Sequence, residues 1–159
     1  MRRFGVVSLD DLTPQQTRQV VDLMIAGWPD HYGPSGAGDA EVAVAARQGI
    51  DPIPQGVAAL SESGAVIGTA ALAARSFGAE QGEDLWCIGL IVDPKWRGQG
   101  IASALVVALT AYASTLQQSH VYTTTQAAEG LFRRLGWKVI REVADESGPW
   151  QVMAKPLFP

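Results

Sequence analysis

The sequence has little of the side-chain chemistry that many proteins use to hold metals or to form cross-links. Its 159 residues include one cysteine, Cys87, and two histidines, His31 and His120. A single cysteine excludes an internal disulfide and any zinc site built from several cysteines. Since only two imidazoles could be added as ligands, we expect no structural metal.

The sequence also lacks runs of basic residues and long apolar segments. The net charge is −4 and the chain has no basic run, so a nucleic-acid surface is not indicated. The longest apolar stretch at helical spacing, residues 101–113, is too short to cross a bilayer. Near the N-terminus, Asp10 and Asp11 interrupt any signal-like apolar segment. We therefore expect a cytoplasmic protein without nucleic-acid or membrane partners.

The composition that is present is typical of a folded domain. Hydrophobic residues make up 47% of the chain and charged residues 18%, which are ordinary globular values. A chain of this length can bury a sizeable core, and we expect one domain over residues 1–159.

Apolar spacing and turn residues predict the order of strands and helices. Thr-Pro-Gln-Gln at residues 13–16 forms a capping box for a first helix, which ends at Trp28. Asp39 is expected to cap a short second helix with Val42, Ala45 and Ala46 on its inner face. Further helices are expected from residue 101 and around 128–135. Strands are expected at residues 4–9, 56–60, 65–73, 85–92, 120–125, 137–143 and 150–155, with loops at 30–38 and 75–83.

The chain is organised around residues 85–105. The apolar run 85–92 predicts a buried strand, which Asp93-Pro94 ends because proline cannot donate to a sheet ladder. Residues 97–100, Arg-Gly-Gln-Gly, then lead into a helix. Glycines let the backbone approach a ligand, and the unpaired N–H groups of a helix start attract anions. This arrangement predicts a diphosphate site. The dinucleotide fingerprint is absent because its last glycine is replaced by Ser103.

Two blocks of sequence resemble the GNAT acetyltransferases. Residues 92–102, Val-Asp-Pro-Lys-Trp-Arg-Gly-Gln-Gly-Ile-Ala, resemble motif A of that family, Gln/Arg-x-x-Gly-x-Gly/Ala. Residues 128–137, Ala-Glu-Gly-Leu-Phe-Arg-Arg-Leu-Gly-Trp, resemble its motif B. The resemblance implies an α/β (α+β) fold with a mixed, mostly antiparallel, twisted sheet, flanked by helices and with splayed central strands. It also implies direct acetyl transfer from acetyl-CoA to the primary amine of a small molecule, and it allows a homodimer.

The resemblance also implies a set of cofactor-binding residues. The pantetheine arm would lie beside the central strand, the diphosphate would sit on the glycine loop, and two positions would face them from the following strand and helix. In this sequence these residues are Leu90, Ile91, Val92, Arg97, Gly98, Gln99, Gly100, Ile101, Ala102, Thr125 and Phe132.

The catalytic residues are less well defined. Asp84 lies where some family members carry a catalytic carboxylate, and Glu83 is its neighbour. The family's acid, a tyrosine, is replaced by Phe132, which has no proton to give. Tyr122, Thr124 or water could donate instead, CoA could leave as thiolate, or the protein could be a poor catalyst. Cys87 is expected to be a small buried hydrophobe.

Other functions stay open at this point. The chain could modify a protein or peptide amine, or it could be a non-catalytic module that binds acyl-CoA. A long open groove would favour the former, whereas a closed pocket under residues 30–38 would favour a small molecule. Aromatic side chains around a cation are a further expectation, and the candidates are Trp28, Tyr32, Trp86 and Trp150.

Overall fold

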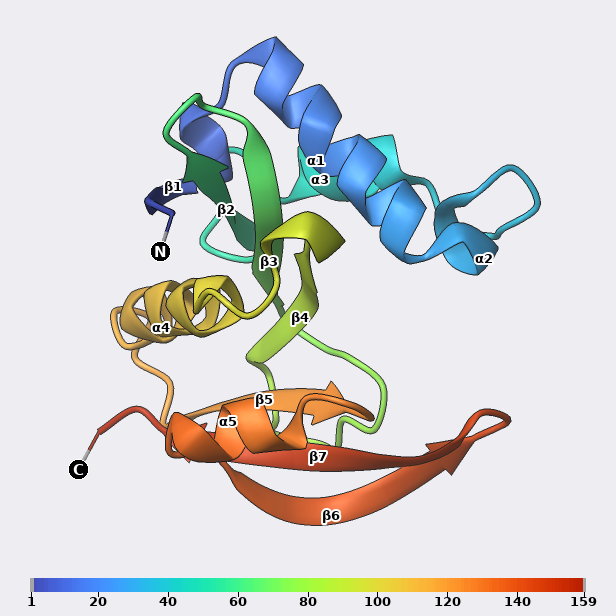
Figure 1. The fold of residues 1–159 in the computed structure, drawn as a ribbon. Helices are drawn as coiled ribbons and strands as arrows, with labels where there is room; N and C mark the ends of the chain where they lie inside the picture. The colour runs from blue at the N-terminus through green and yellow to red at the C-terminus, as the bar shows by residue number, and fades with distance from the viewer. Residues whose placement is uncertain (1, 159) are drawn as a thin grey trace.

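The computed structural model describes residues 2–158 (Figure 1). Its seven-stranded sheet has the order β1-β2-β3-β4-β5-β7-β6, and every neighbouring pair is antiparallel except β4 and β5. The strands are β1 (Phe4–Ser8), β2 (Gln55–Ser61), β3 (Val66–Ala73), β4 (Trp86–Val92), β5 (His120–Thr125), β6 (Lys138–Asp145) and β7 (Gly148–Pro156). The helices are α1 (Pro14–Gly27), α2 (Pro29–Tyr32), α3 (Ala40–Ala46), α4 (Ile101–Ala113) and α5 (Glu129–Arg134), with short 3₁₀ turns η1 (Leu9–Asp11) and η2 (Pro94–Trp96). The predicted mixed, mostly antiparallel sheet flanked by helices is confirmed.

Strands β4 and β5 are joined only at one end. They share a single paired position, Trp86 with Tyr122. The Thr123 hydroxyl also donates a hydrogen bond to the Cys87 carbonyl, at 2.9 Å. Beyond this point the strands diverge, and Figure 1 shows β5–β7 running across the direction of β1–β4. The predicted splay of the central strands is therefore confirmed.

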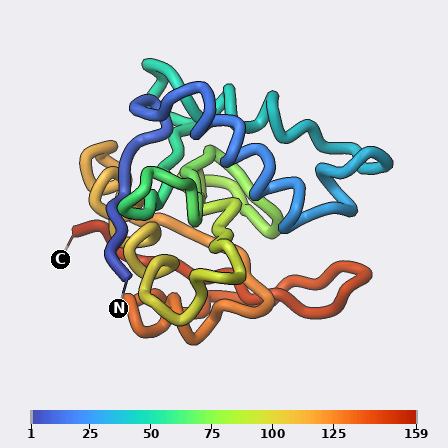
Figure 2. The backbone as a smooth tube through the Cα atoms, turned by 45° about the horizontal axis from the view of Figure 1, so that its top comes forward, coloured from blue at the N-terminus to red at the C-terminus, as the bar shows by residue number. Residues whose placement is uncertain are grey.

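Helices cover both faces of the first half of the sheet. Helix α4 packs over β2, β3 and β4, whereas α1 and α3 pack on the opposite face. Gly68 on β3 permits the close approach of α4, because a Cβ there would lie 3.1 Å from Leu105 Cδ1 and 3.2 Å from Ile101 Cγ2. Figure 2 shows the segment around α2 and the β6–β7 hairpin protruding on the same side of the molecule, as they also do in Figure 1.

Capping and turn residues in the sequence predict most of the helices and strands correctly. The capping box of α1 forms as predicted: Gln16 N donates to Thr13 Oγ1 at 3.1 Å, and Thr13 N donates to Gln16 Oε1 at 3.0 Å. Asp39 caps α3 by accepting from Val42 N. Residues 30–38 are not entirely a loop, because Pro29 starts the single turn of α2.

The buried face of α3 differs from the prediction. Ala40 and Val44 are buried, whereas Val42 is 64% exposed and Ala45 and Ala46 are also exposed. The predicted face was wrong because the helix is short and rich in alanine and valine, so its apolar pattern fits more than one helical phase. The contact with β2 and α1 selects the phase.

Helices that could span a membrane and clusters of metal-binding side chains are both absent from the part of the chain that the structure describes. Between residues 2 and 158, no helix is both long and apolar enough to cross a membrane. In that same part of the chain, no three His, Cys, Asp or Glu side chains gather in a way that could hold a metal ion.

Candidate active site

The glycine loop before α4 leaves the start of that helix open. Gly98 and Gly100 have φ angles of 76° and 81°, in the left-handed region that favours glycine. Gly100 is the N-cap of α4 and supplies no side-chain hydrogen bond to the first helical N–H groups. A Cβ at either glycine would meet nothing within 4 Å. Conformation therefore demands glycine at these positions, and open space lies beside the uncapped helix start.

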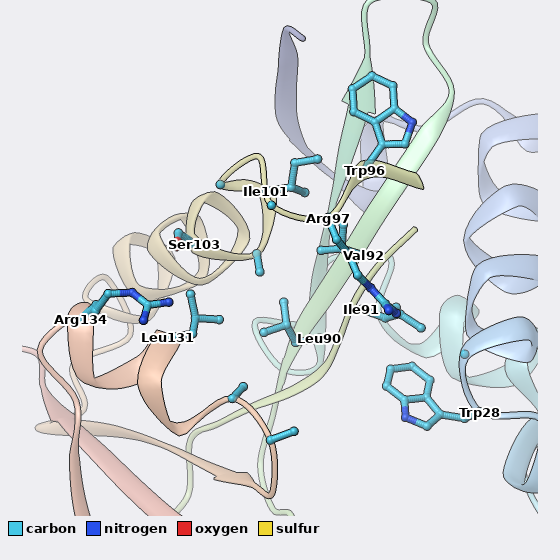
Figure 3. A pocket seen from close by; sticks show the side chains of 16 residues that line it. Trp28, Leu90, Ile91, Val92, Trp96, Arg97, Ile101, Ser103, Leu131 and Arg134 are labelled. Carbon is cyan, nitrogen blue, oxygen red and sulfur yellow. The ribbon is translucent and has the colours of Figure 1, made fainter. Parts of the chain in front are cut away.

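A groove of about 740 Å³ extends from this loop along β4 (Figure 3). Leu90 of β4 and Leu131 of α5 lie on opposite sides of it, and Arg97 reaches along β4 toward Ile91. Arg134 of α5 adds a second cation to the lining. The predicted cofactor residues that line this groove are Leu90, Ile91, Val92, Arg97, Gly98, Gly100, Ile101 and Ala102, while Gln99 does not.

A second cavity, of about 190 Å³, occupies the gap between the diverging strands β4 and β5. Trp28, Leu90 and Ala128 line both this cavity and the groove, so the two adjoin. The remaining predicted cofactor residues, Thr125 and Phe132, line the second cavity.

Strand β4 carries a bulge beside this gap. Ile88 pairs with Ala71 and Ile91 pairs with Thr69, so two residues of β4 lie opposite one residue of β3. Gly89, at the bulge, has a φ of 62°. A bulge bends its strand and leaves main-chain groups unpaired. The single glycine in an otherwise apolar run is the sequence signal for it.

A third cavity, of about 350 Å³, lies beyond the gap and is open to solvent. It shares four lining residues with the second cavity, so all three adjoin, and Trp28 lines each of them. The Trp28 and Tyr32 rings lie 6.3 Å apart in an edge-on arrangement. Of the four aromatic residues predicted as cavity walls, these two line the cavity. The others lie elsewhere, with Trp86 buried against Tyr122 and Trp150 packed on Phe77.

The three candidate catalytic groups gather at the joined end of β4 and β5. Glu83 accepts two hydrogen bonds from the Arg141 guanidinium, which lower the pKa of its carboxyl. Burial raises the pKa of Tyr122, and the Glu83 carboxylate raises it further. Asp84 lies 3.8 Å from Arg75, measured from Oδ1 to Nη1. None of these three candidate groups lines the three cavities, but Arg75 lines the third.

Few side chains around the second cavity could donate a proton to a leaving thiolate. Phe132 is buried, and its ring packs edge-on against Trp137 with centroids 4.9 Å apart. The Thr124 hydroxyl donates its proton to the Phe77 carbonyl, whereas the Thr125 hydroxyl accepts a hydrogen bond from Ala128 N at 2.9 Å and keeps its own proton. Burial raises the pKa of the Cys87 thiol to about 12, so at neutral pH it has almost no thiolate and little nucleophilic character.

Three arginines that line these cavities, Arg47, Arg75 and Arg134, are not among the predicted site residues. The apolar spacing of α5 predicts Arg134 on the outer face of that helix, whereas in the structure it lines the groove. Arg47 lines the third cavity and is buried. The sequence spacing indicates this burial. Arg47 comes seven residues after Ala40 and three after Val44, so it shares a helix face with these two buried residues.

Comparison with known proteins agrees with the family resemblance of the two sequence blocks. The family model described as acetyltransferase (GNAT) domain matches residues 54–139, which include both sequence blocks noted above. Among solved structures, an aminoglycoside 6′-N-acetyltransferase complexed with coenzyme A superposes with a TM-score of 0.78 at 16% identity, over 98% of both chains. The aminoglycoside 6′-N-acetyltransferase from Enterococcus faecium gives 0.78 at 19% identity, also over 98% of both chains.

A phosphinothricin acetyltransferase from Sinorhizobium meliloti, in complex with AcCoA, gives a TM-score of 0.73 at 19% identity over 96% of this chain and 88% of that one. No curated relative matches by sequence. At these identities the solved structures establish the fold, and the family match covers more than half of the chain. The chain therefore belongs to the GNAT acetyltransferase family.

Proposed function

We propose that the protein transfers an acetyl group from acetyl-CoA directly to the primary amine of a small molecule. The observation that carries this proposal is the row of three adjoining cavities along β4. One end is an anion-binding helix start, the middle is a gap between strands, and the far end is a separate pocket beside the bulge. A donor and an acceptor can enter from opposite ends and meet at Gly89.

The donor fits this row in one direction. Its diphosphate would accept hydrogen bonds from the main chain of residues 97–102, with Arg97 and Arg134 beside it. The pantetheine arm would lie against Leu90 to Val92 as an extra strand in the gap, which is a common way of binding an extended amide. Its thioester would then lie at the bulge. The neutral amine attacks the thioester carbonyl, the C–N bond forms, the C–S bond breaks, and the amine loses a proton to a base.

Asp84 is our candidate for that base, because it lies 3.8 Å from Arg75, which lines the third cavity. Asp84→Asn is expected to lower turnover about a hundredfold, the size of effect typical of a general base, while acetyl-CoA affinity stays the same. Glu80→Gln, which removes another exposed carboxylate of the same loop, is the control. Steady-state kinetics and acetyl-CoA titration check both points. Undiminished turnover of Asp84→Asn would remove the residue from the mechanism.

Phe132 is expected to limit the departure of CoA. Phe132→Tyr places a phenol at the second cavity, where it can protonate the leaving thiolate, and turnover should rise about tenfold or more. Phe132→Leu, which adds no proton donor, should give no gain. Equal turnover of Phe132→Tyr and the unmodified protein would mean that another group, such as water, supplies the proton.

A peptide amine is the second candidate acceptor, because the third cavity is open to solvent rather than closed by residues 30–38. Release of the CoA thiol from acetyl-CoA, measured against polyamines, aminoglycosides, amino acids, aryl amines and short peptides, separates the two classes. Thermal stabilisation by acetyl-CoA should reach about 2.7 kcal/mol when the ligand is a hundredfold above its Kd. Stabilisation without release for any amine would favour a binding module.

A further inference from the structure

Arg47 is a buried charge without a charged partner. It follows the last residue of α3 and is 6% exposed. Its main chain is held at both ends, since Arg47 N donates to Val44 O and Gly56 N donates to Arg47 O. Its guanidinium makes a weak contact to Met24 Sδ at 3.8 Å. Among residues 2–158, no carboxylate lies within 4.0 Å of it.

This side chain points to the place where donor and acceptor would meet. The guanidinium lines the third cavity. A Cβ on Gly89 would lie 3.1 Å from its Nη1 and 3.4 Å from its Nη2, so the guanidinium lies directly against the bulge. Gly89 also lines the second cavity. The cation of Arg47 therefore lies at the junction between the second and third cavities.

The rest of the third cavity does not neutralise this charge. The described residues that line it include no carboxylate, and Arg75 adds a second cation, whose Nη1 lies 3.8 Å from Oδ1 of Asp84, a residue outside the lining. Burial lowers the pKa of the Arg47 guanidinium, and the nearby Tyr32 hydroxyl offsets this shift only in part. A guanidinium nevertheless stays protonated in proteins. A buried, unpaired charge is costly, and a ligand anion would remove that cost.

We infer that the acceptor is a small amino acid or related compound, whose carboxylate pairs with Arg47 while its amino group reaches the thioester at Gly89. This inference rests on the proposed function and names the substrate class of the same site. A planar guanidinium binds a carboxylate through two parallel hydrogen bonds, which fixes orientation as well as position. Because Arg47 touches the bulge, only a few bonds can separate the carboxylate from the amine. Polycationic acceptors such as aminoglycosides should bind poorly.

The first test compares matched acceptors in the unmodified protein with acetyl-CoA. Each amino acid is paired with its carboxamide, which keeps the shape and the amine but removes the negative charge. We expect kcat/KM to be about a hundredfold higher for the acid, the size of effect seen when one member of a buried charge pair is lost. Equal use of acid and carboxamide would overturn the inference and leave the proposed function standing.

The second test changes the protein. Arg47→Met keeps an unbranched apolar stem but removes the guanidinium, and it should abolish the preference for the acid, with acetyl-CoA affinity unchanged. The melting temperature of this variant should not fall, because the substitution removes an unpaired buried charge. Arg18→Met makes the same charge change on the exposed face of α1, and the preference should persist. If Arg47→Met fails to fold, Arg47→Lys replaces it and should retain a reduced preference.

A third measurement separates the two proposals. If no amine is acetylated and acetyl-CoA does not stabilise the protein, the proposed function fails. Calorimetric titration with N-acetylated amino acids then still tests the cavity, because these products carry the same carboxylate. Binding that Arg47→Met weakens about a hundredfold would support the inference. Absence of binding to the unmodified protein, or binding that Arg47→Met leaves unchanged, would contradict it.

Discussion

Gly100→Asp is expected to abolish acetyl-CoA binding, with a loss of affinity of more than a hundredfold. The new carboxylate would occupy the open space at the start of α4, where we place the diphosphate. Two like charges about 4 Å apart near a protein surface repel by about 4 kcal/mol, and every 1.4 kcal/mol is a factor of ten. Calorimetric titration with acetyl-CoA measures the effect.

The chain offers a matched control for this substitution. Gly82, in the loop before β4, has a φ of 86°, close to the 81° of Gly100, and a Cβ there also meets nothing within 4 Å. Gly82→Asp therefore adds the same charge and the same backbone strain, about 1–2 kcal/mol, away from the groove. Both variants should melt at similar temperatures, and only Gly100→Asp should lose the ligand. Acetyl-CoA affinity unchanged in Gly100→Asp would remove the diphosphate assignment.

Arg141→Ala is expected to lower the free energy of unfolding by about 2–3 kcal/mol. The side chains of Arg141 and Glu83 are 20% and 13% exposed, and two hydrogen bonds join them. Removing the arginine leaves Glu83 with a largely buried, unpaired charge. In a chain of this size each kcal/mol lowers the melting temperature by about 2–4 °C, so the loss is easily measured by thermal or urea unfolding.

The pH dependence of this effect has a definite sign. Arg141 lowers the folded-state pKa of Glu83, so the pair stabilises the protein above the unfolded pKa, about 4.3. That contribution disappears as the pH falls through the lower folded value. The difference between Arg141→Ala and the unmodified protein should therefore be largest near neutral pH and shrink in acid. Arg133→Ala, which breaks an exposed pair with Glu129, should cost only about 0.3–0.5 kcal/mol. Equal losses in the two variants would contradict the assignment.

The predicted site residues that the structure brings together in the groove are close to one another in the sequence. The strand 86–92, the stop at Asp93-Pro94 and the glycines before α4 follow one another within a short segment, so their chemistry is visible without the fold. The predicted groove residues accordingly line one cavity. Gln99 is the exception. In the binding mode that we propose, the diphosphate contacts the main chain of this loop, so the side chain at that position has no required direction.

The acceptor end could not be predicted in the same way. Arg47 and Gly89 meet because α3 packs beside α1 across β4, and nothing near either residue in the sequence indicates the contact. The sequence pattern also predicts the wrong buried face for α3, the helix that Arg47 follows. Glu83 is a similar case, since the arginine that holds it comes from β6, far along the chain. Its place beside Asp84 suggested a catalytic carboxylate, whereas Arg141 lowers the pKa of Glu83 and donates to both of its carboxylate oxygens.

The single paired position between β4 and β5 has a consequence for the protein's lifetime in the cell. A sheet interrupted at its centre consists of two halves held mainly by side-chain packing, and the free edges along the gap resemble exposed edge strands. A ligand lying there as an additional strand would supply the missing main-chain bonds. Folding would then draw on the ligand's binding free energy, and stability would follow its concentration. The abundance of this protein would thus report on the supply of its own donor.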